Sequence, residues 1–378
     1  MPVRRPVAVS APGKLILMGE HAAVYGRPAL IAAIDLRLTA RFSPVPPGDS
    51  NREVHLDLPG LGHVEVTSWE DLRAYARATR DRWDRYAERP APEVFREVRG
   101  EDRAHVVKIA LGEVAEALSQ DGSALGEGLR LRIESDLPIG SGFGSSAATS
   151  TAVVAGLLAF CGAAEEPERI AHLALEVERR QHGLPSGVDG ATVLHGGVLW
   201  ARRLESGRLD LEPLAVRSPL LDRLRVYDTG TPAEPTGAVV AAVRALRERD
   251  PARHEELLDR MEAATRAFRE LLQGKSEGPE AGLEGDPDRA LHLIREHEAC
   301  LEGLGVVPEQ VRDLVRQVED EGGAAKISGA GALSGPGAGS LLVYHPDRER
   351  VARWTFLRPF PFHPVHLGAP GFRREAFG

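Results

Sequence analysis

The sequence predicts a protein of mixed α and β structure, arranged as two domains that share a cleft. With 378 residues the chain is too long for one ordinary domain and suits two, each with its own hydrophobic core. Segments in which apolar and polar residues alternate, as in strands, stand beside longer segments with the apolar spacing of helices, and glycine-rich turns separate them. These observations predict mixed α and β structure and nothing finer.

Each expected element follows from the spacing of apolar residues. An apolar residue at every second position predicts a strand, and one at every third or fourth position predicts a helix face. Glycine and proline clusters mark the turns. The first expected elements are two strands within 5–18 separated by a turn at 11–13, strands at 36–43 and 52–58 in an antiparallel sheet, two helical stretches within 69–120 of which the second is 104–118, and a strand at 128–134. These are followed by a helix ending at 161, a helix at about 167–181, and strands within 193–215 and at 224–228. The last are helices from 238 to about 318 interrupted by a turn or linker at 274–282, a strand at 340–344, a helix after 347 and a strand near 362–367.

Composition and charge exclude several classes of protein. The formal net charge of −9 argues against a general nucleic-acid binder, because duplex affinity comes chiefly from lysines and arginines that neutralise phosphates. No apolar run approaches the length of a membrane span, so no membrane role is expected. The first residues lack the apolar core of a secretory signal, and a cytoplasmic location is therefore expected. The two cysteines, Cys161 and Cys300, cannot form a disulfide framework.

Lysine is rare in this chain. Of 47 basic residues only Lys14, Lys108, Lys275 and Lys326 are lysines, and the rest are arginines. Each remaining lysine is therefore a candidate for a specific role.

The glycine-rich segment 137–149 is the first candidate functional element. Gly140, Gly142 and Gly144 precede Ser145 and Ser146, and helix-forming alanines follow. Glycine lets backbone N–H groups approach an anion closely, and a helix start adds unsatisfied N–H groups and positive dipole, as in a phosphate-binding turn. A tight strand-to-helix turn capped by serine is the alternative, and the three glycines alone do not decide between the two. The segment lacks the Gly-Lys-Ser/Thr of a Walker A loop and the early βαβ context of a dinucleotide fold.

The segment Pro138-Ile-Gly-Ser-Gly-Phe-Gly-Ser-Ser-Ala-Ala148 resembles the central motif of the GHMP kinases, whose usual form is Pro-x-Gly-x-Gly-Leu-Gly-Ser-Ser-Ala. Phe143 replaces the usual leucine. Two further segments match the family in the right order, so the resemblance spans nearly the whole chain. It implies an α+β fold with an N-terminal domain like ribosomal protein S5 domain 2 over 1–218, a ferredoxin-like C-terminal domain over 219–378, and ATP between them. The nucleotide-binding residues that it implies in this segment are Pro138, Gly140, Ser141, Gly142, Gly144, Ser145, Ser146 and Ala147.

The first of the two other segments that match the family runs from Ser10 to Leu30 and contains Lys14, Glu20 and His21. Taken singly, such residues are more often solvated surface groups or a buried histidine with a partner. The run Gly19-Glu-His-Ala-Ala-Val-Tyr-Gly26 resembles the branch of the family that acts on mevalonate rather than the branch that acts on galactose. The resemblance implies that Lys14 lies beside the reacting hydroxyl and that Glu20 and His21 line the acceptor side.

A block at 178–190, Glu-Arg-Arg-Gln-His-Gly-Leu-Pro-Ser-Gly-Val-Asp-Gly, resembles the same branch. There the glutamate binds Mg²⁺ and the aspartate is the proposed base, so Glu178 and Asp189 take those roles by resemblance, with Ser146 as a second metal ligand. The structural alternative is a helix end with Gly183 as its cap and Asp189 holding a turn.

The third matching segment, Lys326 to Ser340, begins like the C-terminal motif of the family and then departs from it. Gly329 and Gly331 are assigned to the loop near the phosphates, whereas 332–337 stays unassigned and a flexible surface loop is a fair alternative. Asp228-Thr-Gly-Thr231 resembles a strand-end segment that contributes a hydroxyl to the substrate pocket, which makes Thr229 a candidate.

The resemblance implies an ATP- and Mg²⁺-dependent kinase that phosphorylates the primary hydroxyl of mevalonate. In phosphoryl transfer the protein chiefly positions the reactants and stabilises charge, which this residue set suits. The expected partners are two small molecules, ATP and the acceptor, and a homodimer is left open. The alternatives are another GHMP kinase, acting on phosphomevalonate or a sugar, and a sensor on the same fold that binds a small molecule without turnover.

Overall fold

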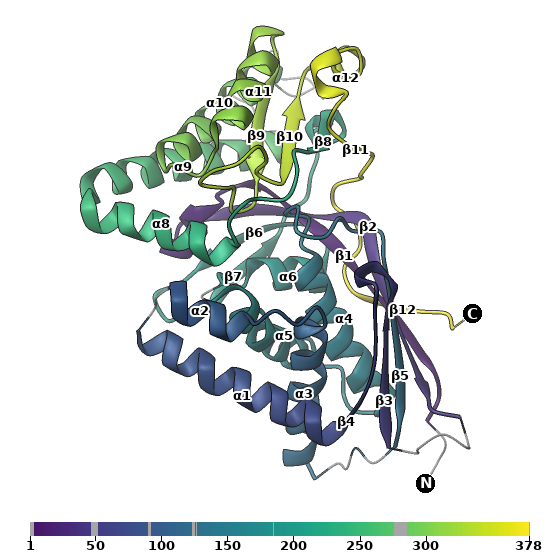
Figure 1. Cartoon of the computed structure of the whole chain (residues 1–378). Coiled ribbons are helices and arrows are strands. Elements are labelled where there is room, and N and C mark those ends of the chain that lie inside the picture. The colour runs from purple at the N-terminus through teal and green to yellow at the C-terminus, as the bar shows by residue number, and fades with distance from the viewer. Residues whose placement is uncertain are drawn as a thin grey trace.

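Within the residues that the structure describes, the chain forms one sheet of eight strands and one of four (Figure 1). The computed structural model of the protein describes residues 4–46, 52–89, 92–122, 125, 127–183, 185–275 and 286–377. The mixed α and β class predicted from the sequence is confirmed.

The larger sheet is built around two long strands, β1 and β2. Its order is β12-β1-β2-β5-β3-β4, and β6 and β7 continue the sheet from the first part of β2. Neighbouring strands are antiparallel except β3 and β5, which are parallel. The strands are β1 (Val7–Met18), β2 (Ala29–Pro44), β3 (Glu53–Leu58), β4 (His63–Ser68), β5 (Leu129–Ser135), β6 (Val198–Arg203), β7 (Leu209–Pro213) and β12 (Arg373–Glu375).

The burial of β2 shows how this sheet is covered. Its first six residues, 29–34, are all buried, and from residue 37 onward buried and partly exposed positions mostly alternate. A continuous buried run is typical of a strand covered on both faces, and alternation is typical of a strand covered on one. The beginning of β2 therefore lies at the centre of the molecule, where both sheets and their helices meet.

Helices lie together on one side of the larger sheet (Figure 1). Among them α4 packs against β1, β2, α3 and α5. Nearly all of its residues from Ala147 to Phe160 are buried, as expected for a helix that is apolar on every side. The helices of this group are α1 (Trp69–Glu88), α2 (Pro92–Arg99), α3 (His105–Gln120), α4 (Ser145–Phe160), α5 (Pro167–His182) and α6 (Val188–His195).

The smaller sheet is antiparallel, in the order β11-β8-β10-β9, and α10 and α11 pack on its β9 edge. Its strands are β8 (Leu224–Asp228), β9 (Ala324–Ser328), β10 (Ser340–Tyr344) and β11 (Phe362–His363). The remaining helices are α7 (Leu220–Arg223), α8 (Thr236–Arg249), α9 (Pro251–Leu272), α10 (Pro287–Gly303), α11 (Glu309–Asp320) and α12 (Arg348–Val351), with short 3₁₀ turns η1 (His21–Tyr25), η2 (Pro59–Leu61) and η3 (Thr355–Leu357).

The C-terminal segment returns to the larger sheet, as the yellow trace in Figure 1 shows. Its strand β12 pairs with β1 at residues 8–10 only. Beyond residue 10, that edge of β1 has no neighbouring strand within the described chain. The division into two domains at 218/219 stays a prediction. The C-terminal segment pairs with a strand of the N-terminal part across this division.

Several expected elements differ from those observed. Residues 7–18 form one strand with a register shift at Pro12/Gly13, because the Pro-Gly pair bends the strand without ending it. Three helices rather than two occupy the described residues of 69–120, and β4, β9 and β12 were not expected. Residues 188–195 form α6, and only its last three residues fall within the 193–215 region expected to be strands. Part of the linker expected at 274–282 lies outside the described residues.

No helix in the described part of the chain is long and apolar enough to cross a membrane.

Candidate functional site

A cavity of about 690 Å³ lies between the two sheets and their helices. Its walls come from the end of β1, the glycine segment before α4, the helices α5, α6 and α8, the strand β7 and the loop after β9. Segments far apart in the sequence therefore surround one space.

The edge of β1 that has no strand neighbour in the described chain is hydrogen-bonded to both glycine-rich segments. The backbone N–H of Lys14 donates to the carbonyl of Phe143 at 2.9 Å, and the N–H of Ile16 donates to Ser328 Oγ at 2.9 Å. The glycine segment and the C-terminal loop are also joined directly, because Ser340 N–H donates to the carbonyl of Ser141 at 2.9 Å.

Two glycines of the 140–144 turn are required by these close contacts. Gly142 and Gly144 have φ of 81° and 79°, in the left-handed region that glycine alone adopts freely. A Cβ on Gly144 would lie 2.7 Å from Lys14 Cγ, and one on Gly142 would lie 2.9 Å from the carbonyl oxygen of Ser328. The turn can approach both neighbours only without side chains.

Lys14 and Asp189 form an ion pair in the cavity. Lys14 Nζ lies 3.1 Å from Asp189 Oδ2. The lysine side chain is 5% exposed and the aspartate is 37% exposed, so the carboxylate is the member that faces the space. Asp189 lies in the first turn of α6, which explains why its side chain points into the cavity rather than capping a turn.

Glu178 and Ser146 form a second polar pair in the same cavity. Ser146 Oγ donates to Glu178 Oε1 at 2.6 Å, Ser150 Oγ donates to the same atom at 3.3 Å, and His182 Nε2 lies 3.6 Å from Oε2. Burial raises the pKa of Glu178 above its ordinary value, while His182 and the serine hydroxyls oppose this rise.

This pair fits a hard divalent cation. Mg²⁺ prefers oxygen ligands and is commonly held by one or two carboxylates, with phosphate and water completing its coordination. The Glu178 carboxylate has no lysine or arginine within ion-pair distance in the described chain, and the Ser146 hydroxyl oxygen lies beside it. A cation here would offset the cost of burying the carboxylate.

Glu20 lies at the end of the cavity beyond Lys14, in a fully buried ionic cluster. Its carboxylate pairs with Lys326 Nζ of β9, and its Oε2 lies 3.4 Å from His297 Nε2 of α10. His297 Nε2 accepts from Gly19 N–H at 2.8 Å, and burial lowers the pKa of His297 well below its ordinary value, so the ring is neutral. Burial raises the pKa of Glu20, which the Lys326 ammonium opposes.

His21 and Glu298 complete the polar surroundings of this end. His21 Nε2 donates to the carbonyl of Ala330 at 2.8 Å, and burial lowers the pKa of its ring. Glu298 accepts from Ile327 N–H at 3.0 Å, and burial raises its pKa to about 8 even though Lys326 opposes this.

The structure brings together most of the residues that the sequence analysis selected. The cavity is lined by Lys14, Glu20, His21, Gly140, Gly142, Gly144, Ser145, Ser146, Glu178, Asp189 and Gly329. Ser141 is buried in the glycine turn and Ala147 in the first turn of α4, and Pro138 is not in the wall.

Gly331 and Thr229 lie outside the cavity wall. A Cβ on Gly331 would lie 2.1 Å from the carbonyl oxygen of Val306, so this glycine serves a close backbone contact. Thr229 Oγ1 donates to the carbonyl of Gly339 at 2.7 Å and accepts from Ala338 N–H at 2.9 Å. Its hydroxyl therefore holds the C-terminal loop, and we do not retain Thr229 as a substrate contact.

Arg203 lines the cavity and was missed by the sequence analysis. Its Nη2 donates to the carbonyls of Pro185 and Ser186 at 3.1 and 2.7 Å, which ties it to the turn before Asp189. Burial, reinforced by the charge of Arg179, lowers the pKa of Arg203 below its ordinary value. No motif marks this arginine among the many others in the chain.

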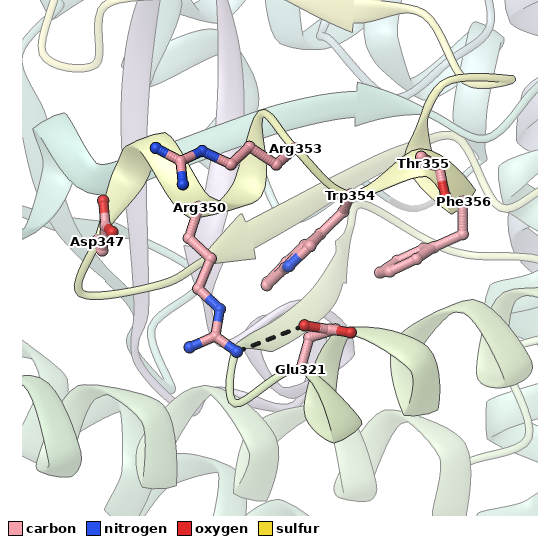
Figure 2. A pocket seen from close by; sticks show the side chains of 7 residues that line it. All are labelled: Glu321, Asp347, Arg350, Arg353, Trp354, Thr355 and Phe356. Atoms are coloured by element: carbon pink, nitrogen blue, oxygen red, sulfur yellow. Dashed lines mark hydrogen bonds and ion pairs between the residues drawn. The ribbon is translucent and has the colours of Figure 1, made fainter.

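A second, open hollow of about 430 Å³ lies in the C-terminal part and shares no residue with the cavity (Figure 2). Arg350 reaches Glu321 across it at 3.5 Å, and Trp354 stacks on Phe356 with 5.6 Å between ring centroids. The charged pair in this hollow is already formed between its own side chains, and none of the residues that the sequence analysis selected lies in its wall.

Three side chains on the larger sheet and beside it, His63, Glu65 and Asp102, have ligand atoms within 4.8 Å of one another. Lys108 Nζ lies 2.7 Å from both Glu65 Oε1 and Asp102 Oδ2. Because the ammonium already neutralises this group, we do not assign it a metal.

Comparisons with known proteins agree with the geometry. The family model described as the N-terminal domain of GHMP kinases matches residues 105–197. Mevalonate kinase from Bos taurus is 30% identical over 392 aligned positions, covering 96% of this chain and 93% of that protein, and mevalonate kinase from Pyrococcus abyssi is 29% identical with coverage of 92% and 90%. Among solved structures, L. major mevalonate kinase in complex with R-mevalonate has a TM-score of 0.65 at 21% identity, covering 96% of this chain and 95% of that chain.

Replacing Glu298 by glutamine should flatten the pH dependence of stability. The folded-state pKa of about 8 lies above the ordinary value of 4.5, so between these values the folded state holds a proton that the unfolded state has lost. Stability therefore falls as pH rises through this window, and Glu298→Gln removes that contribution. Urea unfolding followed by circular dichroism at several pH values from 5 to 8 measures it.

Glu296→Gln, two residues away on α10, is the matched control. Its bond to Arg260 lowers the pKa of Glu296, so its titration lies below the window and the slope should stay that of the wild type. Equal slopes for wild type and Glu298→Gln would contradict the argument.

Proposed function

This chain belongs to the GHMP kinase family, and on that basis we propose that it is an ATP-dependent mevalonate kinase, which transfers the γ-phosphate of ATP to the primary hydroxyl of mevalonate. The observation that carries the proposal is the pair of polar contacts in one cavity. Lys14 lies 3.1 Å from Asp189, and Ser146 lies 2.6 Å from Glu178, beside a glycine turn at a helix start. Relatives of this chain at 27–30% identity over most of its length are mevalonate kinases.

The glycine turn and the start of α4 form the proposed phosphate site. Gly140, Gly142 and Gly144 line the cavity without side chains, and the dipole of the 16-residue helix favours negative charge at this end. Gly329 closes the site from the C-terminal side. We retain the division into domains 1–218 and 219–378, with this cavity between them.

Ser146 and Glu178 are the proposed ligands of Mg²⁺. When bound, Mg²⁺ would neutralise charge on the phosphate groups and favour one orientation of the transferred group. The protein supplies one carboxylate and one hydroxyl, fixed by their mutual bond and by α4 and α5.

Asp189 is the proposed base that accepts the proton of the acceptor hydroxyl as it attacks phosphorus. Its carboxylate is exposed to the cavity while its partner Lys14 is buried, so the lysine is held in place and the carboxylate is free to meet the acceptor. The Lys14 ammonium stabilises the negative charge that develops on the acceptor oxygen. A binding protein without turnover has no need of this pair beside a metal-binding carboxylate.

Arg203 is the proposed partner of the acceptor carboxylate. It is a partly desolvated cation in the cavity wall, and a guanidinium binds a carboxylate through two parallel hydrogen bonds. Apolar side chains beside it, including Val188, Leu209 and Leu211, suit the methyl-bearing carbon chain of mevalonate.

Mevalonate should be the preferred acceptor in a direct assay. ADP release by the purified protein is measured with ATP, Mg²⁺ and, in turn, mevalonate, phosphomevalonate, galactose and homoserine. We expect kcat/KM for mevalonate to exceed the others by about a hundredfold or more, because a misfitting acceptor leaves buried polar groups unpaired. A higher kcat/KM with any other acceptor contradicts the proposal.

Asp189→Ala should lower kcat by about a hundredfold or more, the usual effect of removing a positioned base, with little change in KM for either substrate. Asp210→Asn on β7, an exposed carboxylate outside the cavity wall, is the control and should keep wild-type turnover. Near-normal turnover of Asp189→Ala would refute the assignment.

Arg203→Met should raise KM for mevalonate by about tenfold or more, since a hydrogen-bonded charge pair is lost, and leave KM for ATP nearly unchanged. The control is Arg202→Met, the next residue on β6, which is exposed and outside the cavity wall. Steady-state kinetics with each substrate varied in turn measures both. An unchanged KM for mevalonate would remove Arg203 from the acceptor site.

A further inference from the structure

The C-terminal sheet holds the free edge of β1 through two side chains of one strand. Ser328 and Lys326 are two residues apart on β9, so their side chains point to the same face. Ser328 Oγ accepts from the N–H of Ile16 at 2.9 Å, and Lys326 Nζ donates to the carbonyl of Ile16 at 3.4 Å. Both backbone polar groups of Ile16 are thus bound from β9.

Lys326 also reaches beyond β1 to Glu20. Its ammonium donates to Glu20 Oε1, to the carbonyl of Ile327 at 2.6 Å and to the carbonyl of Ile16. These three acceptors match the three protons of an ammonium group. The lysine and glutamate side chains are each 1% exposed, so the ion pair is fully buried.

Stability alone does not account for this pair. Removing two charges from water costs about as much as their attraction returns, and well-packed apolar residues are often as stable or more stable in their place. The chain also contains only four lysines. A residue type that is rare in this chain, fully buried and bound to three acceptors, points to a role in orienting the groups that it binds.

The segment that Lys326 contacts carries the residues assigned to the acceptor side. Ile16 is two residues from Lys14, which pairs with Asp189. Glu20 and the following His21 both line the cavity. Lys326 itself is not in the cavity wall, so its contact with the site is through these neighbours.

We propose that Lys326 is a positioning residue for phosphoryl transfer: by binding the Ile16 carbonyl and the Glu20 carboxylate, it fixes the path of residues 14–21 and so aligns the acceptor with the transferred phosphate. This inference rests on the proposed kinase function and assigns a role to a residue outside the catalytic pair. In-line transfer is sensitive to placement, and a shift of about 1 Å can cost about a hundredfold in rate.

The first test is Lys326→Met, which keeps the length and apolar stem of the side chain. We expect kcat with mevalonate to fall by about tenfold or more, with KM for ATP within about twofold of wild type, because the phosphate-binding turn is not held by Lys326. A merely structural role would loosen both sites and raise both KM values. Wild-type kcat in Lys326→Met overturns the proposal.

Lys108→Met is the matched control. Lys108 is also a lysine held between two carboxylates, Glu65 and Asp102, but it lies away from the cavity. Its loss should lower the melting temperature without lowering kcat. If Lys108→Met lowers kcat as much as Lys326→Met does, the effect is one of general stability and the proposal fails.

The double variant Glu20→Gln/Lys326→Met covers the case in which the single variant does not fold. It leaves no charge of this pair buried, so it should fold. Its kcat should lie within about threefold of Glu20→Gln alone, because residues that act as a unit have non-additive effects. A further tenfold loss would show that Lys326 acts independently of Glu20 and overturn the proposal.

Different results contradict the proposed kinase function and the positioning role of Lys326. A wild-type protein that turns over none of the acceptors contradicts the proposed function and this inference with it. An active wild type with an equally active Lys326→Met contradicts only the positioning role.

Discussion

The structure depends on one strand edge that is left without a strand neighbour. β12 covers β1 only at residues 8–10, so the polar backbone groups farther along β1 need other partners. They find them in Phe143, Ser328 and Lys326, which come from the glycine turn and from β9. Satisfying these hydrogen bonds brings the separate parts of the cavity to the same place.

Most lysines of the described chain pair with carboxylates in the interior. Three lysines, Lys14, Lys108 and Lys326, each lie against carboxylates with little exposure. At Glu178 the carboxylate has hydroxyl partners instead of a lysine or arginine, and it is the one that we assign to a metal. The lack of a fixed lysine or arginine beside Glu178 in the described chain thus distinguishes it from the carboxylates that these lysines neutralise.

The fold and the site were predictable from the sequence to different extents. Elements with a strong local signal, such as the apolar, alanine-rich α4 and the strands β5 and β8, were expected close to where they lie. The helix α6 was missed because eight residues with two glycines nearby give little helical signal, although Asp189 depends on it for its direction. Arg203 was missed for another reason: only the fold distinguishes an arginine in the cavity wall from those on the surface.

The sequence by itself determined the class of structure and the glycine turn, and it selected Lys14, Glu178 and Asp189 as candidate site residues, because these depend on local composition and on motifs that also occur in the GHMP kinases. Only the tertiary structure decided that Lys14 meets Asp189, that the Thr229 hydroxyl bonds to the C-terminal loop, and that Lys326 reaches Glu20 across 306 positions of chain. The physical reason is that burial and contact between distant residues arise from packing of the whole chain, which local sequence does not encode.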